Sequence, residues 1–202
     1  MEQVNKSVAV LFAGSDSVYK QFQYCDVYDK DRDARTYPGG LPVVAHPPCR
    51  GWGRLRMFAR PEPGEKELAI WAIEQVRRFG GVLEHPETSL LWRELDLPLG
   101  KQRDAYGGFT LSVDQFWWGH RARKRTWLYI VGVEPADIPA IALRFDAITH
   151  TVSTTMRRGR VHFVPKPKIS KAESEHTPPK FATFLINLAM LTTKNPHHAY
   201  TI

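Results

Sequence analysis

Short apolar runs that stop at glycine or proline recur along this chain. Runs of roughly four to eight apolar residues, bounded by turn-forming residues, are typical of strands buried in a sheet. "SVAVLFAG" and "LPVVAHPP" are clear examples. We predict strands within the segments 7–14, 24–29, 41–48, 81–86 and 126–132.

Helical spacing of apolar residues marks two longer segments. Between residues 65 and 79, apolar side chains recur every three or four positions, at Leu68, Trp71, Ala72, Val76 and Phe79. Glycine lies just outside both ends of this stretch, which favours a helix over 65–79. A second helix is predicted within 176–192, with Thr177 as its N-cap and Pro178 at its first position.

The order of the elements predicts the fold. A short helix over 15–22, with Ser15 or Asp16 as its N-cap, follows the first strand. Short apolar strands that alternate with helices indicate a parallel sheet with helices on its faces. We expect one α/β, Rossmann-like domain over residues 1–202, with a mainly parallel sheet and helices on both faces. Segment 145–175 is basic and irregular, and we expect a mobile arm there.

The composition is that of an ordinary globular protein. The chain has 202 residues, of which 43% are hydrophobic and 24% charged, and no apolar run approaches the roughly 18 residues of a membrane span. The first residues lack the basic region and cleavage site of a signal peptide. Two cysteines, Cys25 and Cys49, allow at most one disulfide and no zinc site of cysteines alone. We expect a reduced, cytoplasmic protein without a membrane partner.

The charge points to a class of partner. The formal net charge is +7, and the isoelectric point is about 9.5. A basic balance of this kind favours a polyanionic partner such as nucleic acid.

Reactive side chains fall where two predicted strands end, the edge at which parallel sheets bind ligands. Cys49 follows one strand in "VVAHPPCRGWGRLR". A thiol reacts as thiolate, and we expect the arginines that follow it to lower its pKa; the alternative is a small buried hydrophobe. Glu84 ends the strand in "VLEHP", where it can bond or exchange a proton with a ligand, or form a cap or salt bridge.

A basic block precedes the last predicted strand, in "GHRARKRTWLYIVG". Arginine suits a carbonyl, carboxylate or phosphate, although a solvated basic loop is the plainer interpretation. Trp117 and Trp118 lie just before the block, where they could stack on a base or belong to the core.

The blocks "HPPC", "LEHP" and "DQFWWGHRARKRTWLYIVG" together resemble the cytosine DNA methyltransferases that form 5-methylcytosine. The likeness covers most of residues 7–190 and is nearest to short phage and prophage proteins identified as members of that family. It implies an abbreviated methyltransferase-type fold and DNA modification. It also implies that Cys49 is the nucleophile, that Glu84 holds the base, and that Arg123 and Arg125 are the arginines of the family's third block, with Arg121 at its glutamine.

The resemblance also implies a cofactor and a substrate. S-adenosylmethionine would lie against Phe12 and Gly14, with Asp26 or Asp29 at the ribose hydroxyls. The substrate would be cytosine, or a related pyrimidine, in DNA or as a nucleotide, and a duplex base must leave the stack to react. For nucleic-acid binding we name a set of basic residues: Arg50, Arg54, Arg121, Lys124, Arg157, Arg158 and Arg160.

Departures from the family pattern keep two further hypotheses open. Asp16 stands at the second glycine of the cofactor motif, His85 replaces the asparagine after the glutamate, and one strand–helix unit is missing before His46. The chain could therefore be a non-catalytic nucleic-acid-binding relative, active in DNA protection or anti-restriction. The lesser alternative is a zinc-dependent enzyme that uses the strand-end residues His46, Cys49, His85 and His120.

Overall fold

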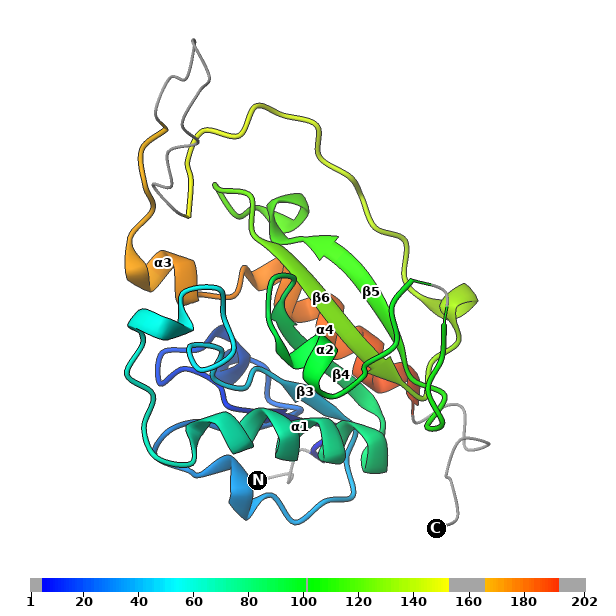
Figure 1. Cartoon of the computed structure of the whole chain (residues 1–202). Coiled ribbons are helices and arrows are strands. Elements are labelled where there is room, and N and C mark those ends of the chain that lie inside the picture. Colours follow the sequence, from blue (N-terminus) through cyan, green and yellow to red (C-terminus); the bar gives the residue numbers. More distant parts are fainter. Residues whose placement is uncertain (1–4, 101, 153–165, 193–202) are drawn as a thin grey trace.

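A six-stranded sheet in the order β2-β1-β3-β4-β6-β5 runs through the protein (Figure 1). The structure is a computed structural model that describes residues 5–100, 102–152 and 166–192. The strands are β1 (Val8–Leu11), β2 (Cys25–Tyr28), β3 (Val43–Ala45), β4 (Gly81–Pro86), β5 (Phe109–Asp114) and β6 (Arg125–Val131). Strands β2, β1, β3 and β4 are parallel, whereas β6 runs antiparallel to both β4 and β5.

A long helix covers each face of the sheet. On one face, α1 (Glu65–Phe79) packs its small and branched residues against Leu11, Val43 and Leu83. On the other, α4 (Pro179–Thr192) packs Phe181, Leu185 and other apolar side chains against alternate residues of the same strands. The α/β, Rossmann-like fold expected from the alternation of elements is therefore confirmed.

Short elements complete the fold. They are α2 (Leu91–Glu94), α3 (Lys171–Glu175) and five 3₁₀ turns: η1 (Val18–Gln21), η2 (Ala34–Thr36), η3 (Arg56–Phe58), η4 (Gln115–Trp118) and η5 (Pro135–Asp137). None of the helices in the described part of the chain is long and apolar enough to cross a bilayer.

Most predicted elements are present, with corrections at their ends. The helix over 65–79 and the strand over 81–86 are found with these bounds. The helix expected over 15–22 is only the turn η1, whose cap is Ser17. Helix α4 starts at Pro179, because the Pro178 carbonyl accepts its first hydrogen bonds. Strand β5 was not predicted.

The close approach of β3 and β4 depends on glycine at Gly81. Its φ is +116°, and a Cβ there would lie 2.0 Å from the carbonyl oxygen of Val43. Any other residue would force the two backbones apart. The sequence "GGV" thus fixes the strand pair whose carboxyl ends carry the candidate site.

Candidate functional site

The carboxyl ends of β3 and β4 bring two polar side chains together on the face covered by α4. Val44 pairs with Val82 and Ala45 with Leu83 in the parallel register. Side chains two residues apart share a face of a strand, so His46 lies beside Glu84, on the same face as Val44 and Val82. His46 Nδ1 lies 3.0 Å from Glu84 Oε2.

A third side chain extends this pair. The hydroxyl of Tyr19, from η1, lies 2.9 Å from His46 Nε2. If Glu84 is ionised, His46 Nδ1–H donates to it, and Nε2 shares a hydrogen bond with the Tyr19 hydroxyl, whose direction depends on the tautomer of the ring. Burial is the main cause that raises the pKa of Tyr19 well above its ordinary value, so this phenol keeps its proton. The ring of His46 therefore joins a proton donor to a carboxylate.

Gln115 engages the other carboxylate oxygen. Its Nε2 donates to Glu84 Oε1 and to Thr126 Oγ1, at 3.1 Å in each case. Gln115 begins η4 and is 1% exposed. Glu84 is thus held from both sides by uncharged or histidine donors, and its carboxylate cannot rotate freely.

Electrostatics keep Glu84 ionised. Burial by itself would raise the pKa of its carboxyl group, but the hydrogen bond and charge of His46, followed by the charge of Lys124, outweigh burial and lower it. Glu84 is therefore a hydrogen-bond acceptor at neutral pH.

The loop that carries Cys49 is anchored by Trp52. The Cys49 carbonyl accepts bonds from the amides of Trp52 and Gly53, which close a turn. The Trp52 ring is 2% exposed, and its Nε1 donates to the Lys66 carbonyl of α1 at 3.0 Å. The prolines before Cys49 and this tryptophan after it fix the position of an otherwise exposed cysteine.

The thiol of Cys49 is coupled to the Glu84 cluster. Desolvation is the main cause that raises its pKa, although the residue as a whole is exposed; Glu84 raises the pKa further, and Lys124 lowers it. The expectation that the arginines following Cys49 lower this pKa is wrong. Arg50, the nearest in sequence, pairs with Glu65 at the start of α1 instead.

Lys124 is the cation that acts on both Cys49 and Glu84. Alternation along β6 explains why: Lys124 shares the face of Thr126 and Leu128, and Leu128 is the register partner of Glu84. The three expected arginines pair with carboxylates: Arg121 with Glu173, Arg123 with Asp114 and Arg125 with Glu87. All three have side chains that are more than half exposed.

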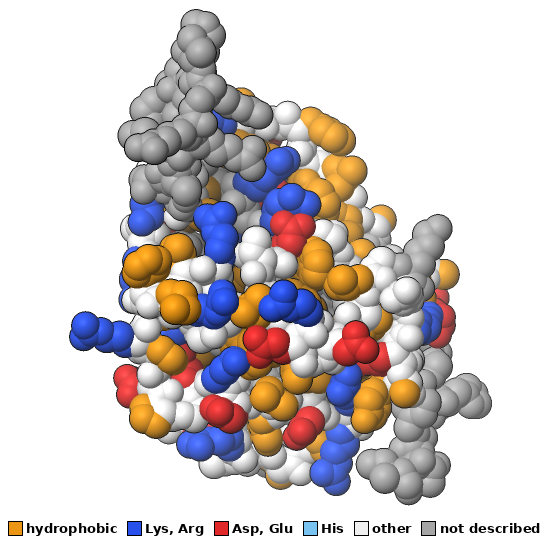
Figure 2. Space-filling model, in the orientation of Figure 1, with side chains coloured by type: hydrophobic (Ala, Val, Ile, Leu, Met, Phe, Trp, Pro, Cys, Tyr) orange, Lys and Arg blue, Asp and Glu red, His pale blue; other side chains and the backbone are white. Residues whose placement is uncertain are grey.

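Exposed apolar and basic residues alternate after Cys49. Leu55, Met57 and Phe58 are 61%, 80% and 86% exposed, and they lie between Arg54, Arg56 and Arg60. On the face drawn in Figure 2, Lys and Arg side chains are spread among such apolar groups. The further arginines named for nucleic-acid binding, Arg157, Arg158 and Arg160, lie outside the described residues.

The residues expected at the cofactor lie around the carboxyl ends of β1 and β2. Phe12 follows β1 with a φ of 62°, and its ring packs edge-on against Trp71 of α1. Gly14 has room for a side chain apart from Asp16 Oδ1 at 3.3 Å. Phe12, with its positive φ, changes the direction of the chain after β1, and the chain then leads into η1.

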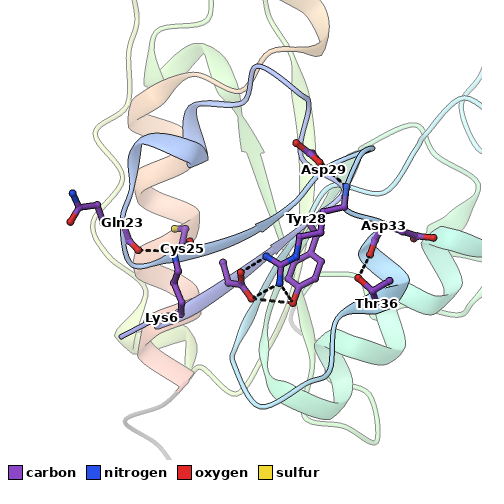
Figure 3. Close-up of polar contacts among 9 residues, drawn as sticks. Lys6, Gln23, Cys25, Tyr28, Asp29, Asp33 and Thr36 are labelled. Atoms are coloured by element: carbon purple, nitrogen blue, oxygen red, sulfur yellow. Dashed lines mark hydrogen bonds and ion pairs between the residues drawn. The ribbon is translucent and has the colours of Figure 1, made fainter. Parts of the chain in front are cut away.

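Both candidate acids for the ribose already have partners within the chain. Asp26 pairs with Arg32 at 2.5 Å and accepts at 3.0 Å from the hydroxyl of Tyr28, which is labelled in Figure 3. Its carboxylate therefore has partners within β2 and the turn that follows. Asp29 follows β2 and accepts from the amides of Asp31 and Arg32. Its other oxygen pairs with Lys20 Nζ at 2.6 Å, and this hydrogen bond is the main cause that lowers the pKa of Asp29 to about 2.

Among the described residues, the histidines expected as zinc ligands do not gather into a metal site. His85 points to the opposite face of β4 from Glu84, where its ring packs against Trp92. Burial lowers the pKa of His85 to about 4, so the ring is neutral. His120 Nδ1 is engaged by the backbone of Ala122. Across the described residues, no three His, Cys, Asp or Glu side chains are grouped as metal ligands.

Trp118 belongs to the hydrophobic core. Trp118 packs against Phe181 and Phe184 of α4, with ring centroids 4.9 and 4.8 Å apart, as the core interpretation of this residue expects.

A hollow of about 640 Å³ lies near α2 and includes Trp92 and Trp127 in its wall. Trp127 is on the face of β6 opposite Lys124, so this hollow is separate from the Cys49 cluster.

Comparison with known proteins gives no identity. No protein-family model matches the chain, and no curated protein matches it at a significant level.

Proposed function

We propose that this chain is a cytosine-directed, methyltransferase-like enzyme with Cys49 as its nucleophile. The observation that carries the proposal is the geometry at this strand edge: His46 and Gln115 hold the Glu84 carboxylate at 3.0 and 3.1 Å, and Cys49 follows His46 by three residues on the same loop. A reactive thiol, an ionised carboxylate and a cation at one strand edge are the groups that addition to a pyrimidine ring requires.

Each residue has a role in the proposed reaction. The Cys49 thiolate forms a bond to carbon 6, and the electron pair of the carbon 5–carbon 6 double bond moves to carbon 5. Glu84 holds the N3 edge and accepts the hydrogen bond of the proton that N3 takes up from solvent, while His46, which bonds both Glu84 and the Tyr19 hydroxyl, orients the carboxylate. Lys124 takes the place expected for an arginine at the O2 carbonyl. After methylation, loss of the carbon 5 proton restores the double bond and releases Cys49.

The surface after Cys49 supports a nucleic-acid substrate. Proteins that bend or open a duplex insert apolar side chains such as Phe, Leu and Met between base steps, with arginines on the phosphates. Leu55, Met57 and Phe58 are exposed and alternate with arginines beside the proposed nucleophile. A duplex base that leaves the stack would reach Cys49 next to this loop.

S-adenosylmethionine, when bound, would supply the methyl group. The donor set fits its ribose: Asp29 is an ionised carboxylate at the end of β2, and its present partner, Lys20, is a flexible ammonium with 43% of its side chain exposed. The two ribose hydroxyls can replace the Lys20 ammonium as hydrogen-bond donors to Asp29. Phe12 and Gly14 would line the same edge.

We expect Lys20→Met to bind S-adenosylhomocysteine two- to fivefold more tightly than the wild type, because an exposed ion pair that competes with the ribose is worth about 1 kcal/mol or less. Asp29→Asn should bind it at least tenfold more weakly. Calorimetric titration measures both. If Asp29→Asn binds as tightly as the wild type, Asp29 does not hold the ribose.

One observation favours the non-catalytic relative as a second candidate. Asp29 is already bonded by Lys20 and two amides, and the thiol of Cys49 has a raised pKa. Such a chain would bind DNA through the same surface without methylating it. Absence of calorimetric binding of both S-adenosylmethionine and S-adenosylhomocysteine to the wild type would favour this candidate.

A further inference from the structure

A small basic groove lies where the segment before β6 meets two segments from later in the chain. Its volume is about 180 Å³, and its wall is formed by Arg123, Ile148, His150, Thr151 and Lys166. Isolated bridges join Ala122 to His150 and Thr151 to Lys168, so three separate segments meet there. The wall contains three basic residues and no acidic one.

The groove is held in place by a chain of hydrogen bonds. Arg121 Nη1 lies 3.2 Å from His150 Nε2, and because a guanidinium only donates, Nε2 must be the acceptor. Nδ1 then carries the proton and donates to Thr149 Oγ1 at 2.8 Å. Glu173 of α3 fixes Arg121 through two bonds. His150 is therefore oriented before any ligand arrives.

Two cations of the wall have donor hydrogens beyond their present contacts. Arg123 pairs with Asp114 through Nε at 2.9 Å, which leaves its two terminal amino groups. Lys166 donates to the Ile148 carbonyl with one of three ammonium hydrogens. A guanidinium fork and an ammonium around one small groove are the donors that a phosphate group prefers.

We infer that this groove binds a phosphate group of the substrate, and so positions the pyrimidine against Cys49. The inference rests on the proposed function, because it takes the cluster of Cys49, Glu84 and Lys124 to be the base site. The same phosphate chemistry is found in a DNA backbone and in a free nucleotide. The groove shares no residue with the proposed base site. Lys166 can therefore be substituted without changing the residues that hold the base.

The first experiment measures binding of a DNA duplex to the full chain at several salt concentrations. Lys166→Gln should reduce the slope of log affinity against log salt by about one unit, because one phosphate contact is lost. The matched control is Arg78→Gln, in the last turn of α1 beside the amino end of β4, which loses the same charge at the opposite edge of the sheet. It should leave the slope nearly unchanged.

The second experiment distinguishes the source of the phosphate. If the ligand is a nucleotide, Lys166→Gln should bind deoxycytidine monophosphate about tenfold more weakly and deoxycytidine as the wild type does. If Lys166→Gln alters neither the duplex slope nor the affinity for the monophosphate, the inference is wrong. The failure of this inference can be told apart from the failure of the proposed function. If Lys166→Gln flattens the duplex slope but the wild type forms no adduct through Cys49, the phosphate groove stands and the proposed enzyme activity is wrong.

Discussion

Cys49→Ser will form no covalent adduct with DNA that contains 5-fluorocytosine, whereas the wild type will accumulate one in the presence of S-adenosylmethionine. Fluorine at carbon 5 cannot leave as a proton does, so the bond between Cys49 and carbon 6 persists. A serine hydroxyl is a far weaker nucleophile at neutral pH, and the expected loss is complete within detection. Denaturing electrophoresis and mass spectrometry of the adduct measure the result.

The matched control for this experiment is Cys25→Ala. Cys25 is 3% exposed, and burial raises the pKa of its thiol to about 11, so it should be inert. Cys25→Ala should form the adduct at the wild-type rate. An adduct on Cys49→Ser, or its loss in both variants, would contradict the assignment of the nucleophile.

The pH dependence of the wild type follows from the raised pKa of Cys49. At pH 7 only a small fraction of this thiol is thiolate, and that fraction rises about tenfold for each pH unit below the pKa. Adduct formation, and alkylation by iodoacetamide, should therefore accelerate from pH 7 to pH 9. A rate that is constant over this range would indicate a thiol already ionised at pH 7.

The sequence pattern was sufficient for the central strands and the long helices. Apolar runs closed by glycine or proline located β1, β3 and β4, because strands covered on both faces of a parallel sheet are apolar at nearly every position. Strand β5, "FTLSVD", was missed because its partly polar sequence does not form a continuous apolar run. The antiparallel direction of β6 could not be read from its residues, because direction depends on pairing across the sheet.

The candidate site was predicted only in part, for a geometric reason. Position at a strand end identified Cys49 and Glu84, but the face on which each side chain lies depends on register. Lys124 could have been chosen over its neighbouring arginines, because it alternates with Thr126 and Leu128 on one face of β6. Gln115 and Tyr19 carried no such signal, since they reach Glu84 and His46 only through the packing of η4 and η1.

Glu84→Gln should slow formation of the 5-fluorocytosine adduct by about a hundredfold, since an amide lacks the negative charge that holds the N3 edge and has one acceptor oxygen where the carboxylate accepts from both His46 and Gln115. The rate of adduct accumulation at saturating DNA measures the loss. The matched control is Glu94→Gln, which removes the same charge from a surface pair with Lys66 and should react as the wild type does. Equal slowing in both variants would mean that lost charge, and not the position of Glu84, sets the rate.

Acid unfolding supplies a readout of Glu84 that does not depend on the reaction. Its folded-state pKa, about 2, lies below the roughly 4.3 of an unfolded glutamate, so between these values the unfolded chain binds the extra proton. The stability from Glu84 is therefore complete above about pH 5 and falls as the pH drops toward 2. Denaturant unfolding should show that the wild type loses more stability than Glu84→Gln over this interval, whereas Glu94→Gln should follow the wild type. Parallel curves for the wild type and Glu84→Gln would show that the carboxylate is not held by His46 and Lys124, and the proposed role of Glu84 at the N3 edge would then have no support.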